Sequence, residues 1–158
     1  STMGPLVADR RLEVMEDFIS DAVSSGGEVI SGGGRGQSPG SFFEPTLIRD
    51  VPDTAKIMIE EPFGPVAPSA SFSSIDEIIE RANSLPFGLA SYAFTSNPRT
   101  SQILKSEIES GMLAINSMHI HSVETPFGGL KHSGYGYEGS IEGLEAFLVT
   151  KYSSEIYT

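Results

Sequence analysis

The sequence predicts an α/β fold in which helices and strands alternate along the chain. Three observations support this prediction. Apolar residues recur at three-to-four spacing in several segments, short aliphatic or aromatic runs lie between these segments, and glycine, proline or asparagine separates them. A chain of 158 residues, 39% of them hydrophobic, can bury a hydrophobic core. We therefore expect a layered arrangement of helices and strands.

The first quarter of the chain should contain a helix, a strand and a second extended segment. Residues 8–25 place their apolar side chains on one helical face, and Gly26-Gly27 should end that helix. A strand is expected at 28–31 and an extended segment at 42–48. The glycine-rich residues between them lack the spacing of a phosphate-binding loop, so a surface turn is the better interpretation of 32–39.

The remaining elements follow from capping and turn signals. The chain passes from a polar turn at 52–54 through 56–59 without an assigned element, and a strand should follow residues 60–66. Ser74 and Glu77 have the spacing of a capping box and begin a helix that stops near Asn83. The last expected elements, in chain order, are a strand at 90–95, a helix opened by Asn97-Pro98, a strand at 112–115, a helix at 138–148 and a strand at 149–157.

Composition excludes several classes of function. The formal net charge of -11 repels nucleic acid and anionic lipid, and no apolar run is long enough to cross a bilayer, so we expect a soluble, cytoplasmic protein. The chain has no cysteine, which removes disulfides, thiolate metal sites and thiol nucleophiles. His119 and His121 lack further ligands, so no metal site is predicted.

Two motifs carry the functional information. The first is Glu60-Glu61-Pro62-Phe63-Gly64-Pro65-Val66, in which two carboxylates precede an aromatic and a Gly-Pro pair. By itself it indicates little more than an acidic turn. The second is the block from Pro126 to Gly139, PFGGLKHSGYGYEG, which lies within the long glycine-rich stretch 117–140. Long loops of this kind in compact domains are often functional.

Together the motifs resemble the aldehyde dehydrogenase superfamily, specifically its carboxyl-terminal part. The family pattern E-E-x-F-G-P is followed by A-N-x-x-x-[FY]-G-L-A, an asparagine, and P-F-G-G-x-K-x-S-G-x-G-R-E. The chain matches it in order with 60–65, Ala82-Asn83 and 87–90, Asn116, and 126–138. The resemblance implies the C-terminal portion of the catalytic domain at 1–148 and an oligomerisation strand at 149–158.

For the cofactor, NAD or NADP, the resemblance implies a role for two residues. Glu61 matches the glutamate that accepts hydrogen bonds from the nicotinamide ribose, a role suited to an ionised acceptor. Phe63 matches the aromatic beside the nicotinamide. A core phenylalanine is the alternative interpretation of Phe63.

For the substrate and the chemistry, the resemblance implies further residues. Phe127 matches an aromatic of the aldehyde channel, although packing alone would also explain it. Glu138 matches a proton-relay partner of the general base. The alternative is a carboxylate that caps the following helix. His121 and Ser122 fall in the loop that sets substrate preference, where paired histidines are more often only solvated surface.

The run Ser122-Val123-Glu124-x-Pro126 resembles the succinic semialdehyde dehydrogenase branch, so a carboxylated aldehyde is the first expectation for the substrate. That branch commonly has Ser where this chain has His121. The broader family usually has Arg where this chain has Tyr137. Both departures leave the identity of the aldehyde open.

Family chemistry needs a nucleophilic cysteine and a general-base glutamate, which in family order precede the first residue of this chain. We therefore expect a truncated piece of a larger homo-oligomeric enzyme, inactive alone. The alternative is a noncatalytic binding or assembly module that retains the fold. A further alternative, a phosphate-binding domain built on residues 32–36, would require a phosphate ligand there.

Overall fold

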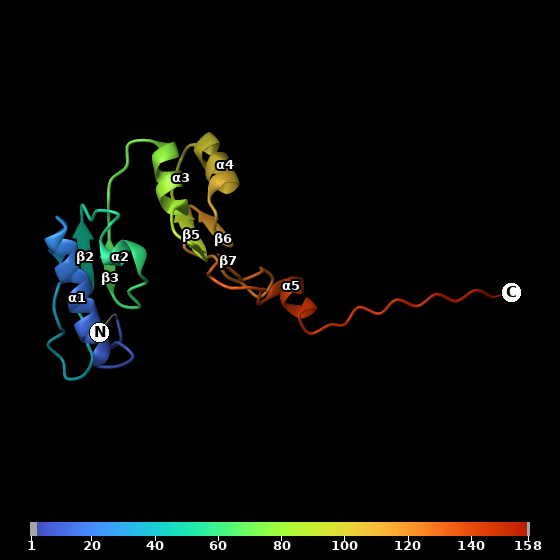
Figure 1. The fold of residues 1–158 in the computed structure, drawn as a ribbon, viewed down its shortest axis with the longest axis horizontal. Coiled ribbons are helices and arrows are strands. Elements are labelled where there is room, and N and C mark those ends of the chain that lie inside the picture. The colour runs from blue at the N-terminus through green and yellow to red at the C-terminus, as the bar shows by residue number, and fades with distance from the viewer. Residues whose placement is uncertain (1–2, 158) are drawn as a thin grey trace. The chain divides into compact units, whose positions relative to one another are not determined.

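The computed structural model describes residues 3–157. It divides into two compact units, Ser1–Phe72 and Ser73–Thr158, and their helices and strands are labelled in Figure 1. Both units combine helices with short strands, which confirms the α/β prediction.

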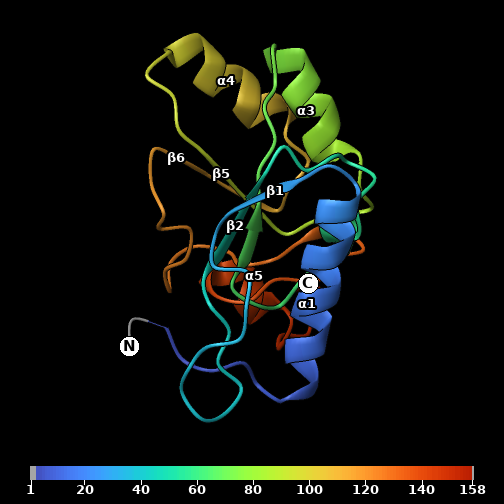
Figure 2. The same cartoon turned by 90° about the vertical axis from the view of Figure 1, so that its left-hand side faces the viewer.

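The first unit is built on a three-stranded sheet in the order β1-β2-β3. Strand β1 (Glu28–Ser31) is antiparallel to β2 (Thr46–Arg49), and β2 is parallel to β3 (Val66–Pro68). Helix α1 (Arg10–Ser24) runs alongside this sheet, and Figure 2 shows it beside β1 and β2.

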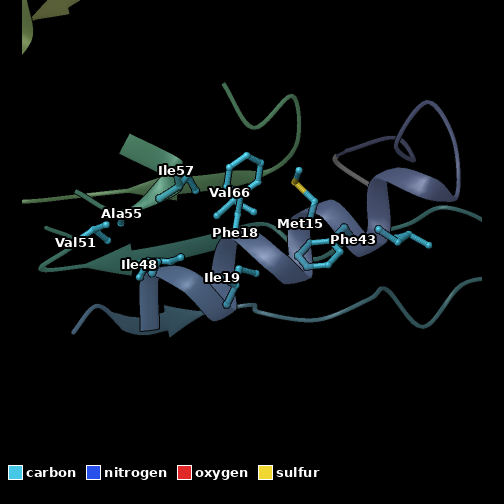
Figure 3. Packing of buried hydrophobic residues seen from close by; sticks show 11 residues of the cluster. Met15, Phe18, Ile19, Phe43, Ile48, Val51, Ala55, Ile57 and Val66 are labelled. Atoms are coloured by element: carbon cyan, nitrogen blue, oxygen red, sulfur yellow. The ribbon is translucent and has the colours of Figure 1, made fainter. Parts of the chain in front are cut away.

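The core of the first unit lies between α1 and the sheet (Figure 3). Met15 and Ile48 are fully buried, and Phe18 is 4% exposed. Each such side chain contributes at most about 1.5 to 3 kcal/mol through removal of apolar surface from water. The buried residues of this cluster are Leu12, Met15, Phe18, Ile19, Ala22, Phe43, Ile48, Val51, Ala55, Ile57 and Val66.

Helix α1 is shorter than the predicted 8–25 at its start and ends as expected. Its N-cap is Asp9, whose carboxylate accepts a hydrogen bond from the Ser41 hydroxyl and does not cap the helix. At the other end Gly26 has a φ of 109°, a left-handed conformation that glycine adopts without strain. The predicted glycine stop is confirmed.

Helix α2 (Lys56–Ile59) was not predicted from the sequence. Its first amide is satisfied from outside the segment, because the Lys56 N–H donates to Asp21 Oδ2 of α1 at 2.7 Å. Lys56 Nζ also lies 2.8 Å from Asp17 Oδ2, and this partner raises the Lys56 pKa. These stabilising contacts come from residues more than thirty positions away, so the local sequence pattern could not predict helix α2.

The glycine-rich loop after β1 joins two antiparallel strands, as predicted. Gly32 is required there, because a Cβ would lie 2.4 Å from the Pro45 carbonyl oxygen. The buried Thr46 hydroxyl accepts a hydrogen bond from Gly33 N–H at 2.9 Å and donates to Glu44 O at 2.8 Å. The Arg35 guanidinium pairs with both oxygens of Glu16 at 2.7 and 2.8 Å. The Arg35 guanidinium is therefore already paired with a carboxylate of α1, which disfavours a phosphate-binding role.

The second unit contains a parallel strand pair joined by a helix. Strand β5 (Ala90–Ala93) pairs with β6 (Met112–Ile115), and helix α4 (Pro98–Glu107) connects them. Strand β4 (Phe87–Gly88) is antiparallel to β7 (Leu130–Lys131). Helix α3 (Ile75–Asn83) lies beside α4 in Figures 1 and 2.

Side chains cap both long helices of this unit. Asn97 Oδ1 accepts from the amides of Arg99 and Thr100, and Pro98 begins α4. At α3, Ser74 Oγ accepts from Glu77 N–H at 3.2 Å, which confirms half of the predicted capping box. The Glu77 carboxylate bonds the amide and hydroxyl of Ser73, and these bonds lower the Glu77 pKa.

The C-terminal elements differ from the prediction. Helix α5 spans only Ser140–Glu145, because Gly139, with a φ of 66°, is its N-cap. Residues 149–157 have no strand assignment in the single chain, whose described part offers them no paired neighbour (Figure 1). A partner subunit would have to supply that pairing, so the oligomerisation strand stays a prediction. Within residues 3–157, no helix has the length and apolar content needed to cross a bilayer.

Candidate functional site

The turn that follows α2 carries the two predicted cofactor residues. The Glu61 side chain is exposed. The Phe63 ring is 73% exposed, and its backbone has a φ of 43°. An aromatic residue rarely adopts this left-handed conformation, which the surrounding structure must impose. The alternative that Phe63 is a core residue is wrong for this chain.

Two side chains of helix α1 contact the backbone of this turn. Arg11 Nη2 donates a hydrogen bond to the carbonyl oxygen of Pro62. Gly64 lies directly against Met15, because a Cβ at Gly64 would be 2.2 Å from the Met15 sulfur. The turn is therefore fixed on both sides of Phe63, while the ring itself projects into solvent.

A shallow apolar hollow borders the same turn. It has a volume of about 350 Å³, and Leu47, Gly64, Val66 and Ala67 contribute to its lining. Apolar concavities with nearby polar groups are the usual form of small-molecule sites. The exposed Glu61 and Phe63 thus belong to a segment that also borders a cavity.

In the second unit, the structure brings Phe127 and His121 together. Their ring centroids are 5.4 Å apart with a tilt of 59° between the planes. Phe127 is half-buried and His121 is exposed. His121 belongs to the loop that the resemblance assigns to substrate preference. Its ring packs against the Phe127 ring and covers part of it.

The Ser122 side chain belongs to a small turn. Its amide donates to Thr125 Oγ1 at 2.9 Å, and the two hydroxyl oxygens are 3.4 Å apart. A hydrogen bond from the Ser122 side chain lowers the Glu124 pKa, which favours the ionised carboxylate. The loop therefore presents a carboxylate as well as the imidazole of His121.

Glu138 lies directly before the N-cap of α5, Gly139, and its side chain is exposed. The proton-relay role and the helix-capping alternative both stay predictions. The Glu138 backbone pairs with Phe127, with both N–H to O distances at 2.8 Å. This pair closes the glycine-rich loop of residues 127–138.

Lys131 and Asn83, two motif residues to which the sequence analysis assigned no role, form a network of hydrogen bonds with the backbone. Lys131 Nζ donates to the carbonyl oxygens of Asn83 and Leu85 at 3.0 and 3.2 Å and lies 2.5 Å from Glu109 Oε2. The Asn83 side-chain amide in turn bonds the backbone of Glu107 and Glu109 at 2.7 and 2.9 Å. Lys131 thus stabilises the C-terminal end of α3, where carbonyl groups lack helical partners.

Glycines permit close backbone approach in the same region. A Cβ at Gly111 would lie 1.9 Å from the Gly128 carbonyl oxygen, and one at Gly88 would lie 2.2 Å from Glu109 O. The Gly88 amide also donates to Ser133 Oγ at 2.9 Å. The backbone before β6 therefore packs against Gly128, and the backbone before β5 packs against Glu109.

Asn116 completes this set of structural motif residues. Its φ of 55° is one that asparagine tolerates better than most residues. Its side chain bonds both the amide and the carbonyl of Thr95 at 2.8 Å. Asn116 therefore fixes the ends of β5 and β6 together.

The predicted residues thus fall into two local groups. Glu61 and Phe63 share a turn of the first unit, and His121, Ser122, Phe127 and Glu138 share a loop of the second. Within residues 3–157, no group of three or more histidine, cysteine or acidic residues is arranged to hold a metal ion.

Comparison with known proteins decides the family. The model described as "Aldehyde dehydrogenase family" matches residues 1–153. The chain belongs to the aldehyde dehydrogenase family. The predicted resemblance is thereby confirmed.

Two curated relatives of this aldehyde dehydrogenase chain illustrate the match. The 4-(hydroxymethyl)benzenesulfonate dehydrogenase of Comamonas testosteroni is 43% identical over 150 residues, which are 95% of this chain and 31% of that protein. The mitochondrial succinate-semialdehyde dehydrogenase of Rattus norvegicus is 42% identical over 152 residues, 96% of this chain and 29% of that protein.

Solved structures agree with the sequence match. A succinate-semialdehyde dehydrogenase from Burkholderia pseudomallei superimposes with a TM-score of 0.92 at 36% identity, over 94% of this chain and 31% of that one. An E. coli NADP dependent enzyme gives 0.89 at 39% identity, over 91% and 30%. The aldehyde dehydrogenase chain spans about 30% of the length of these proteins.

Proposed function

We propose that this chain is the C-terminal part of an NAD(P)-dependent aldehyde dehydrogenase that oxidises an aldehyde to the carboxylic acid. The observation that carries the proposal is the family match over residues 1–153, together with a turn that exposes a carboxylate and an aromatic ring. When bound, the dinucleotide accepts the hydride that leaves the substrate.

The turn fits the nicotinamide end of such a cofactor. An ionised carboxylate can accept hydrogen bonds from two neighbouring ribose hydroxyls, and Glu61 is exposed to do so. The Phe63 ring offers a rigid apolar face beside it. Glu61 would hold the ribose and Phe63 would limit the positions of the nicotinamide ring.

The substrate is proposed to carry a second acidic group, with succinic semialdehyde as the first candidate. The names of the two curated relatives specify substrates that bear a carboxylate or a sulfonate. In this chain His121 lies against Phe127, next to Ser122. The Phe127 ring would line the aldehyde channel, and His121 and Ser122 would contact the distal acidic group.

Glu138 is proposed to relay a proton to the general base of the intact enzyme. Its backbone pairing with Phe127 ties it to the substrate loop, and its exposed carboxyl can reach a neighbouring group. The nucleophilic cysteine is absent from this chain. The 158-residue chain alone should therefore turn over no aldehyde.

The parent enzyme is proposed to be a cytoplasmic homo-oligomer. Residues 149–157 include Val149, Tyr152, Ile156 and Tyr157, each at least 85% exposed in the single chain. An unpaired segment of this composition favours pairing with a strand from another subunit. Light scattering of the intact enzyme should give at least a dimer, and a strict monomer would contradict this assignment.

A substrate comparison tests the proposal. The intact enzyme that contains this chain is assayed with NAD and with NADP on succinic semialdehyde, a sulfonated aldehyde and butanal, which lacks the acidic group. We expect kcat/KM to be highest for one of the two anionic aldehydes. Equal kcat/KM for butanal would refute the substrate class, and no dinucleotide reduction with any aldehyde would refute the enzymatic function.

The absence of cysteine supports one alternative, a noncatalytic binding or assembly module. The two proposals differ in what the gene encodes upstream. A dehydrogenase requires several hundred further residues that include a cysteine and a glutamate in family order, whereas a module requires none. Sequencing the coding region upstream of Ser1 distinguishes them.

A further inference from the structure

Arg11 makes a contact that bridges the two ends of the first unit. Its Nη2 atom donates to the Pro62 carbonyl oxygen, 51 positions away in sequence. The Arg11 Nε atom is buried and has no hydrogen-bond partner among residues 3–157. A buried donor of a permanently charged group is unfavourable. It persists here because packing and the Pro62 contact fix the side chain.

Arg11 and Met15 act as a pair on one face of α1. They are four residues apart, which places them one above the other on the helix. Arg11 contacts Pro62 and Met15 contacts Gly64, the residues on either side of Phe63. The two anchors surround the one aromatic residue of the turn that has a left-handed backbone.

The energetics of the turn require such anchors. A φ of 43° at Phe63 is unfavourable for a residue with a bulky side chain, and the ring recovers little burial because it is 73% exposed. Without the Pro62 contact, the backbone would relax toward conformations that point the ring elsewhere. Glu61, which immediately precedes Pro62, would move with it.

We propose that Arg11 is a positioning residue for the cofactor site: by holding the Pro62 carbonyl, it keeps Glu61 and Phe63 in the geometry that the nicotinamide end of the dinucleotide requires. This inference rests on the proposed function of Glu61 and Phe63. Arg11 acts through the turn and does not itself contact the dinucleotide.

The test uses Arg11→Met in the intact enzyme, which removes the donor and keeps most of the apolar stem. Arg10→Met is the matched control, because Arg10 is the exposed neighbour on the same helix and loses the same charge. For Arg11→Met we expect the first-turnover rate of hydride transfer to fall about tenfold and the dinucleotide to bind more weakly. Binding of ADP, which lacks the nicotinamide ribose, should not change.

A second substitution separates positioning from direct contact. If Arg11 acts through the turn, Arg11→Met adds little to the defect of Glu61→Gln in the double variant. Fully additive defects would mean an independent contact and would overturn the inference. Arg11→Lys, which retains a charged donor on a flexible stem, should recover part of the lost rate. Failure to recover any rate also counts against it.

The outcomes distinguish this inference from the proposed function. If Glu61→Gln is impaired while Arg11→Met matches Arg10→Met, the role of Arg11 is refuted and the cofactor assignment stands. If Glu61→Gln behaves as the unmodified enzyme, the cofactor assignment fails first.

Discussion

Lys131→Met should destabilise the second unit more than loss of the exposed charge of Lys105 does. Lys131 donates to two carbonyl oxygens and pairs with Glu109. A hydrogen bond from a charged donor contributes about 1.5 to 3 kcal/mol, and a partly exposed ion pair about 0 to 1. The Lys131 side chain is 27% exposed, so the lower values apply, and two hydrogen bonds of about 1.5 kcal/mol each give an expected loss of about 3 kcal/mol.

The assay is urea unfolding of the chain followed by tyrosine fluorescence. All five tyrosines lie in the second unit and the chain has no tryptophan, so this signal reports that unit alone. Lys105→Met is the control, because Lys105 is exposed on α4 and loses the same charge. Equal free energies of unfolding for the two variants would refute the structural role of Lys131.

Three further predictions concern the same unit. Gly111→Ala places a methyl group 1.9 Å from the Gly128 carbonyl oxygen and should cost about 3 kcal/mol or prevent folding; an unchanged free energy of unfolding in the same tyrosine assay would refute this close approach. Asn116→Ala removes both bonds to Thr95 and should cost about 2 to 3 kcal/mol; an unchanged urea midpoint would contradict this. The Glu77 pKa is lowered by Ser73, so its contribution is present above the ordinary value of 4.5 and is lost as pH falls below it. The stability difference between Glu77→Gln and the unmodified chain should therefore shrink on acidification, and a constant difference would refute the assignment.

Elements with local signals could be predicted from the sequence. The apolar spacing of α1, the glycine pair after it and the Asn97-Pro98 start of α4 all act within a few residues, and the structure agrees with them. Helix α2 could not be predicted, because Asp21 caps it from α1. Strand β7 was not predicted either, since two residues leave no periodicity to detect.

The motifs located the candidate site but did not separate its functions. Sequence alone could not show that Lys131 and Asn83 bond the chain's own backbone, because these contacts join residues more than twenty positions apart. The resemblance placed Phe63 beside the cofactor and left a core position as the alternative, since phenylalanine is more often buried than not. The 73% exposure of Phe63 decides against the core position.

The most direct test of the central claim compares Glu61→Gln with Glu60→Gln in the intact enzyme. Both are exposed glutamates of one turn and lose the same charge, but only Glu61 is assigned to the nicotinamide ribose. Stopped-flow measurement of reduced dinucleotide in the first turnover should show a rate lower by about tenfold or more for Glu61→Gln, as expected for the loss of a bond worth about 1.5 to 3 kcal/mol. Glu60→Gln should retain the rate of the unmodified enzyme. Equal rates for the two variants would contradict the assignment of Glu61 as the residue that holds the cofactor.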